Sequence, residues 1–79
     1  MDHYDFDVLD GGARIAVARG VALPNSRAIW SRIATIAKGF GRPGRLIRVT
    51  DSAGKIVILV GAATAIRLAA EMLGPLAYR

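Results

Sequence analysis

The sequence predicts an α+β domain with the element order ββαββα, in which two β-hairpins form a four-stranded antiparallel sheet. Apolar residues alternate with a period of two in two pairs of short segments, and a glycine-containing turn joins each pair. The segment between the pairs and the segment at the C-terminal end have helical periodicity instead. A chain of 79 residues is the size of one domain, so we expect a single domain over residues 1–79.

The first hairpin is predicted over residues 3–18. In residues 3–9 the side chains of Tyr4, Phe6 and Val8 share one face, and polar side chains occupy the other. The sequence Asp-Gly-Gly at 10–12 is typical of a turn, because glycine adopts a positive φ without steric cost. Residues 14–18 resume the alternation as the second strand, and residues 20–24 are expected to be a connector.

An amphipathic helix should follow, with Asn25 or Ser26 as its N-terminal cap. Its apolar positions recur at spacings of four, three and four, and they are Ile29, Ile33, Ile36 and Phe40. Trp30 lies beside this stripe, where it either packs in the core or anchors an interface. The glycines from Gly39 onward are expected to end the helix.

The second hairpin is predicted over residues 45–60. Asp51 and Gly54 are the first and fourth residues of an expected type I turn. The strand over residues 55–60 has no polar face, so we expect it to be central in the sheet or covered on both sides. After Gly61, residues 62–73 predict a helix that is apolar around most of its circumference and packs on the sheet or against a partner.

Residues 56–73 hold more apolar surface than a domain of this size can bury, so the sequence predicts a homo-oligomer, a dimer or higher. The chain has no cysteine and one histidine, which excludes disulfides and a zinc site as stabilisers. The expected interface residues are Trp30, Ile56, Ile58, Val60, Ala65, Ile66, Ala69, Met72 and Leu73.

The chain is basic, with a net charge of +5, and four of its six acidic residues lie in residues 1–10. Such a charge suits nucleic acid, acidic proteins or anionic lipid. Four basic residues around the turn from the first helix to the third strand are candidates for phosphate contact: Lys38, Arg42, Arg45 and Arg48. We favour the interpretation that they form a solvated rim, and weak nucleic-acid binding is the alternative.

His3, Asp5 and Asp7 lie on one face of the first strand, where they could hold a divalent cation. We favour ion pairs with arginines on neighbouring strands, such as Arg14 or Arg48, because three ligands on one flat strand converge poorly. A serine–histidine arrangement has no support, since His3 is the one histidine. We therefore expect no catalytic residue, no cofactor and no metal.

Three motifs in order carry a resemblance to a known family: Tyr4-x-Phe6-x-x-x-Asp10-Gly11, then Gly20-x-x-Leu23-Pro24, then Val49-x-Asp51-x-x-Gly54. This pattern is similar to a family of short proteins that is abundant in alphaproteobacteria and is classified as a domain of unknown function. The resemblance covers about residues 3 to 60. It implies a small bacterial cytoplasmic ββαββ domain without an established activity.

The function that we expect is a non-enzymatic interaction module that self-associates. One alternative is a nucleic-acid-binding accessory protein that uses the basic rim. The other is a small enzyme or ligand carrier whose pocket forms at a subunit interface. The acidic first ten residues do not resemble a signal peptide, and Gly61, Arg67 and Glu71 interrupt the apolar stretch that could span a membrane. We therefore expect a cytoplasmic protein without membrane contact.

Overall fold

The computed structural model describes residues 2–40, 42 and 44–73, and of residues 69, 70, 72 and 73 it describes only the backbone. The predicted order ββαββα is confirmed. The six elements are β1 (Asp2–Asp10), β2 (Ala13–Leu23), α1 (Ser26–Phe40), β3 (Arg45–Asp51), β4 (Ile56–Gly61) and α2 (Ala62–Leu73).

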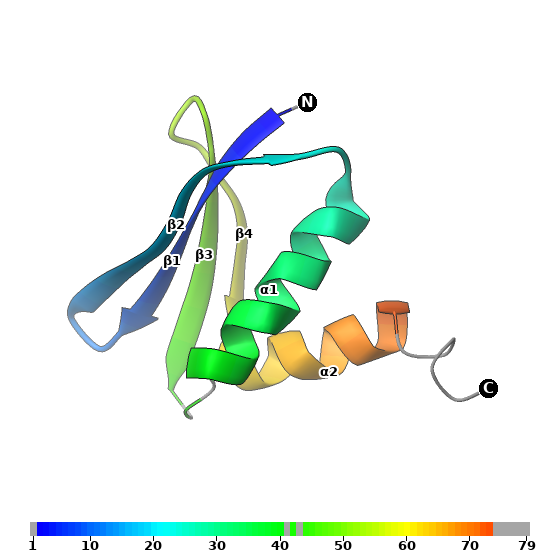
Figure 1. The fold of residues 1–79 in the computed structure, drawn as a ribbon. Helices are drawn as coiled ribbons and strands as arrows, with labels where there is room; N and C mark the ends of the chain where they lie inside the picture. Colours follow the sequence, from blue (N-terminus) through cyan, green and yellow to red (C-terminus); the bar gives the residue numbers. More distant parts are fainter. Residues whose placement is uncertain (1, 41, 43, 74–79) are drawn as a thin grey trace.

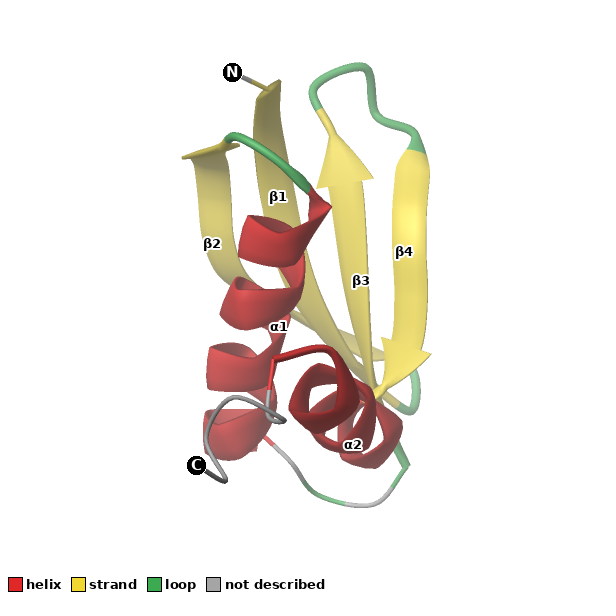
Figure 2. Cartoon of the chain, turned by 90° about the vertical axis from the view of Figure 1, so that its right-hand side faces the viewer, coloured by secondary structure: helices red, strands yellow, loops and turns green. Residues whose placement is uncertain are grey.

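The four strands form one antiparallel sheet in the order β2-β1-β3-β4. Each hairpin therefore contributes one inner and one outer strand, and the pairing of β1 with β3 joins the two hairpins. Figure 2 shows this order from left to right behind the helices. β1, which carries four of the six acids, thus has a neighbour on each side.

Both helices lie on the same face of the sheet, so the described residues form two layers and none of them covers the opposite face, which we call the open face (Figures 1 and 2). α2 packs mainly against α1 and crosses the sheet where β3 begins and β4 ends. The core lies between the layers. Its fully buried large side chains are Phe6, Val8, Ile33, Ile47 and Val49. The predicted inward faces of the first strand and first helix are thus confirmed, because alternation and helical spacing dictate them locally.

β2 is longer than the sequence suggested. The segment from Gly20 to Leu23, expected to be part of a connector, continues the strand and pairs with the start of β1. The pairing has register shifts on both sides of Phe6, and Gly20 has a φ of +61°. This irregularity breaks the alternation, which explains why the period-two pattern in the sequence stopped at Ala18.

α1 begins with a side-chain cap, as predicted. Asn25 Oδ1 accepts a hydrogen bond from the N–H of Ala28 at 2.9 Å, so Asn25 is the cap rather than Ser26. The helix includes Gly39 and ends at Phe40, within the glycine-containing segment where its end was predicted. The helical stripe over Ile29, Ile33 and Ile36 is buried, and the burial of this stripe outweighs the low helix propensity of one glycine in the last turn.

The predicted turn between β3 and β4 is confirmed. The N–H of Gly54 donates to the carbonyl oxygen of Asp51 at 3.0 Å, and Asp51 Oδ1 accepts from the N–H groups of Ala53 and Lys55. Gly54 has a φ of +85°, a conformation that other residues rarely adopt. The aspartate side chain and the glycine together fix the β3–β4 register.

The prediction for β4 was wrong. We expected a central strand or one covered on both faces, but β4 is an outer strand, and its face away from the helices is uncovered. A run of apolar residues indicates two apolar faces without indicating what covers them. Among the described residues, no helix is long and apolar enough to cross a membrane.

Candidate functional site

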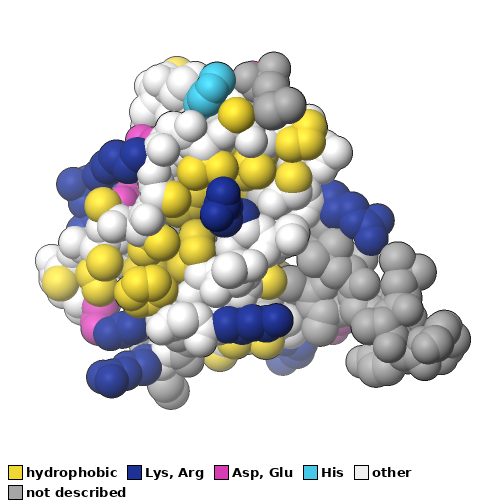
Figure 3. Space-filling view, in the orientation of Figure 1, with side chains coloured by type: hydrophobic (Ala, Val, Ile, Leu, Met, Phe, Trp, Pro, Cys, Tyr) yellow, Lys and Arg dark blue, Asp and Glu magenta, His cyan; other side chains and the backbone are white. Residues whose placement is uncertain are grey.

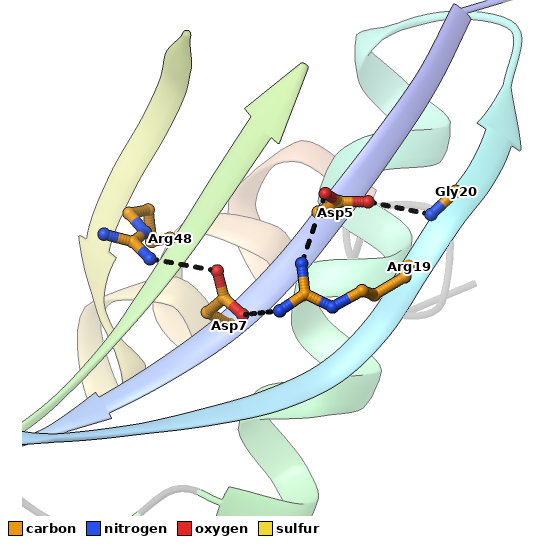
Figure 4. Close-up of polar contacts among 5 residues, drawn as sticks. All are labelled: Asp5, Asp7, Arg19, Gly20 and Arg48. Carbon is orange, nitrogen blue, oxygen red and sulfur yellow. Dashed lines mark hydrogen bonds and ion pairs between the residues drawn. The ribbon is translucent and has the colours of Figure 1, made fainter. Parts of the chain in front are cut away.

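The open face of the sheet carries a group of charged side chains around Asp7. Asp7 and Arg48 are directly opposite in the β1–β3 register, and Arg48 Nη2 donates to Asp7 Oδ2 at 3.1 Å. Arg19 Nη2, from β2, lies 3.8 Å from Asp7 Oδ1. Figure 4 shows Asp7 between these two guanidinium groups. Although it lies on the open face, the Asp7 residue is only 3% exposed, because the two arginine side chains cover it.

Asp5 extends this group along β1. Its Oδ1 accepts from the N–H of Gly20 at 2.8 Å, and its Oδ2 accepts from Arg19 Nη1 at 3.4 Å (Figure 4). The irregular pairing in β2 places both Gly20 and Arg19 beside Asp5. One carboxylate on β1 therefore holds the bent part of β2, and Arg19 links the two carboxylates.

A hollow of about 270 Å³ lies on this face, lined by Asp5, Asp7, Arg14, Arg19, Arg48, Thr50, Gly54 and Ile56. Two buried atoms beside it, Asp7 Oδ1 and Arg48 Nε, have no hydrogen-bond partner among the described residues. Both atoms are nevertheless near an opposite charge, since Arg19 lies close to Oδ1 and Arg48 is bonded to Oδ2. The simplest interpretation is a structural ion-pair group that ties β2, β1 and β3 together.

The cation site that His3, Asp5 and Asp7 could form was the less favoured interpretation, and their contacts do not support it. Asp5 and Asp7 are committed to arginines, and no group of three His, Cys, Asp or Glu that could hold a metal ion occurs in the described part of the chain. The favoured interpretation of paired arginines is supported for Arg48. The second cation is Arg19 rather than Arg14, because the irregularity in β2 changes which side chains face β1.

The second notable surface is the outer edge of the sheet at β4. Ile56, Val57 and Leu59 are 49%, 42% and 54% exposed, and they are three of the five large exposed apolar side chains that the structure describes. Leu46, on the neighbouring strand β3, and Ile66, on α2, are the other two. The strand itself, Ile56–Gly61, contains no charged residue and no proline. We call this strand and its outward side chains the free β4 edge.

The predicted interface residues are divided by the structure. Ile56 and Ile66 are exposed, whereas Trp30, Ile58 and Val60 are half-buried against the core. A further correction concerns Ala65, which is fully buried in the core and cannot contact a partner. The small side chain of Ala65 allows α2 to pack closely against the rest of the chain. The side chains of Ala69, Met72 and Leu73 lie outside the described part of the structure.

The predicted phosphate contacts do not form one surface. Arg48 lies on the open face with Asp7, whereas Arg45 donates from Nε to Asp10 Oδ2 at 3.1 Å and lies 5.9 Å from the centre of the Phe40 ring. Lys38 and Arg42 are exposed. On the side of the molecule in Figure 3, basic side chains form separate groups with apolar and neutral surface between them.

Sequence reasoning missed Val57, Leu59 and Leu46 as exposed apolar residues, and it missed Arg19 as a partner of the acids. We predicted Ile56, Ile58 and Val60 as interface residues. The register shift opposite Val49 and Thr50 places Ile56 beside Thr50 and Leu59 beside Arg48, so Leu59 rather than Ile58 or Val60 shares the open face with Ile56. The absence of any polar residue in the strand was the one available signal, and it could not show which side chains are exposed.

Comparison of the chain with protein-family models, with curated proteins and with solved structures gave no significant match. The resemblance to an alphaproteobacterial family therefore stays a prediction. The function has to be argued from the residues on these two surfaces.

Proposed function

We propose that the protein is a non-enzymatic interaction module that self-associates through the free β4 edge. The observation that carries this proposal is an outer strand whose side chains are all apolar and whose three outward residues are each 42% exposed or more. An unpaired strand edge presents N–H and C=O groups to which another strand can add. The strand thus offers apolar contact and main-chain hydrogen bonds at the same place.

The contrast between the two outer strands supports the choice of edge. β2 carries Arg14 and Arg19, and its pairing with β1 is irregular. Charged residues and bulges of this kind prevent pairing at a sheet edge. The β4 strand has neither a charge nor a proline to prevent it, so addition of a strand is favoured at β4 and disfavoured at β2.

Charge does not oppose a second copy at this edge. Two chains that each carry a net charge of +5 repel each other, most strongly where basic side chains meet. The β4 strand itself contains no arginine or lysine, so two copies that meet at the free β4 edge bring no basic side chains of this strand together. Self-association there therefore avoids placing like charges in contact, and a chain without cysteine is consistent with work in the cytoplasm.

Nucleic-acid binding has less support. Arg45 and Arg48 are paired with acids and lie at different places, so among the described residues the four basic candidates do not follow one groove or ridge. Binding to phosphates through Lys38 and Arg42 alone would be weak and salt-sensitive.

Sedimentation velocity at micromolar concentration tests the proposal. We expect the native chain to be a dimer and the variants Leu59→Lys and Val57→Lys to be monomers, because a charge at either position would be buried in the contact. Ala22→Lys, an exposed alanine on β2, is the matched control and should leave the dimer intact. Circular dichroism should show the same fold in all variants. A monomeric native chain, or a dimer that tolerates both lysines, would contradict the proposal.

A further inference from the structure

The geometry points to one arrangement of the dimer, and this inference rests on the proposed self-association. We propose that two copies pair β4 with β4 in antiparallel orientation about a two-fold axis at Leu59. The result is a continuous eight-stranded sheet, with the four helices on one side and both open faces on the other.

The direction of the main-chain groups in β4 identifies Leu59 as suitable for the axis. The N–H of Asp51 donates to the carbonyl oxygen of Lys55 at 2.9 Å, so the backbone groups of Asp51 point toward β4. In an antiparallel ladder these groups alternate from residue to residue between the two neighbours. Along β3, the groups of Arg48 therefore point toward β1 and away from β4.

Leu59 is the residue opposite Arg48 in the β3–β4 register. Since Arg48 makes no main-chain bond to it, the N–H and C=O of Leu59 point to the outer side of the sheet. Two Leu59 residues that face each other across a two-fold axis can exchange both N–H···O bonds. Across a two-fold axis the same residue of each copy supplies one donor and one acceptor, so the pair is self-complementary.

The side chains fit the same axis. Leu59 is the most exposed large apolar residue in the described structure, at 54%, so it gains most from contact with its own copy. On the helix side, Ile58 of one copy would lie opposite Val60 of the other, and both are half-buried apolar residues. Side chains that pack opposite each other on neighbouring strands contribute to the stability of a sheet.

Charge also favours the antiparallel orientation. Lys55, just before β4, would lie at opposite ends of the paired strands in the two copies, separated by roughly 26 Å at about 3.3 Å per residue. A parallel arrangement would place these two lysines side by side. In Figure 2 no helix extends past β4 on the outer side of the sheet, so among the described residues none obstructs the approach of a second strand.

Single-cysteine variants test the arrangement, because the native chain has no cysteine to interfere. With a short bismaleimide, Leu59→Cys should form a covalent dimer about a hundredfold faster than Lys55→Cys, since groups held together react at an effective concentration near millimolar. Leu46→Cys, an exposed residue on the open face, reports the alternative in which the sheets pack face to face. Sedimentation of each variant before crosslinking checks that it still associates.

The outcomes separate this arrangement from self-association itself. Fast crosslinking at Leu59 supports the arrangement. If the native chain is a dimer but Leu46→Cys reacts faster, or all three variants react slowly, the β4 pairing is wrong and self-association stands. If the native chain is a monomer, both proposals are wrong. Amide exchange of the native chain gives a second readout, because the N–H of Leu59 should become protected as concentration rises.

Discussion

Asp7 and Arg48 lie directly opposite each other on β1 and β3, the two strands that join the hairpins, and their side chains are 3.1 Å apart at Oδ2 and Nη2. The contact therefore ties two halves of the sheet that are far apart in sequence. Its carboxylate is almost completely removed from solvent, whereas the guanidinium is partly exposed. Loss of one partner should matter more than loss of both.

We predict that Asp7→Ala lowers the free energy of unfolding by about 3 kcal/mol, because it leaves the guanidinium of Arg48, whose side chain is 23% exposed, without its partner. The double variant Asp7→Val, Arg48→Leu should lie close to the native chain, since apolar residues of similar volume often replace a buried ion pair without loss. Urea unfolding measures both. Asp10→Ala, which removes an exposed ion pair with Arg45, is the control and should change stability by less than about 1 kcal/mol.

The cap of α1 gives a second prediction. Asn25→Ala removes the acceptor for the N–H of Ala28 and should destabilise the fold by about 1 kcal/mol, which lowers the melting temperature by about 4–8 °C for a domain of this size. Ser26→Ala, at the exposed first position of the helix, should leave the melting temperature unchanged. Equal effects of the two substitutions would contradict the assignment of Asn25 as the cap.

The turn between β3 and β4 gives a third. Gly54→Val forces a β-branched residue to a φ of +85°, and strain of this kind destabilises by about 1–3 kcal/mol. Gly12→Ala is the matched control, because Gly12 is not among the glycines with a positive φ and an added Cβ there meets no atom within 4 Å. A Gly54→Val variant as stable as the native chain in urea would mean that the turn adopts another conformation.

The burial of Ala65 gives a fourth. Ala65→Leu should overpack the core and destabilise the fold by about 1–3 kcal/mol. Ala63→Leu, at an exposed position of the same helix, should have little effect. Both are best measured in the Leu59→Lys background, where association does not contribute to the apparent stability. If Ala65→Leu alters only the oligomeric state, the residue belongs to an interface after all.

The elements that local signals determine could be predicted from the sequence. Alternation in residues 3–9, the stripe over Ile29 and Ile33, and the Asp51–Gly54 turn each depend on residues close in the chain, and all three were confirmed. Asn25 was one of two predicted caps for the same reason. Side-chain period and turn chemistry act within a few residues, so they can be read without knowing the rest of the fold.

The candidate site depended on relationships that the sequence does not contain. The pair of Asp7 and Arg48 was one of two options, because strand order decides which residue faces Asp7. The exposure of Leu59 could not be predicted, since an apolar strand is equally suited to the centre and the edge of a sheet. The role of Arg19 depends on the irregularity in β2, which shifts the register without a change in composition.

β1 is synthesised before β3, which begins at Arg45. Because β3 is one of the two neighbours of β1 in the sheet, β1 has a neighbour on one side only until β3 has left the ribosome. Until then its β3-facing edge is open in the nascent chain, and chains on neighbouring ribosomes could pair with it. Asp5 and Asp7 give that temporary edge two carboxylates but only one cationic partner on β2, Arg19, and the remaining negative charge disfavours such pairing. Once β3 pairs with β1, Arg48 binds the carboxylate of Asp7, so a group that disfavoured pairing with other chains becomes part of the native β1–β3 contact.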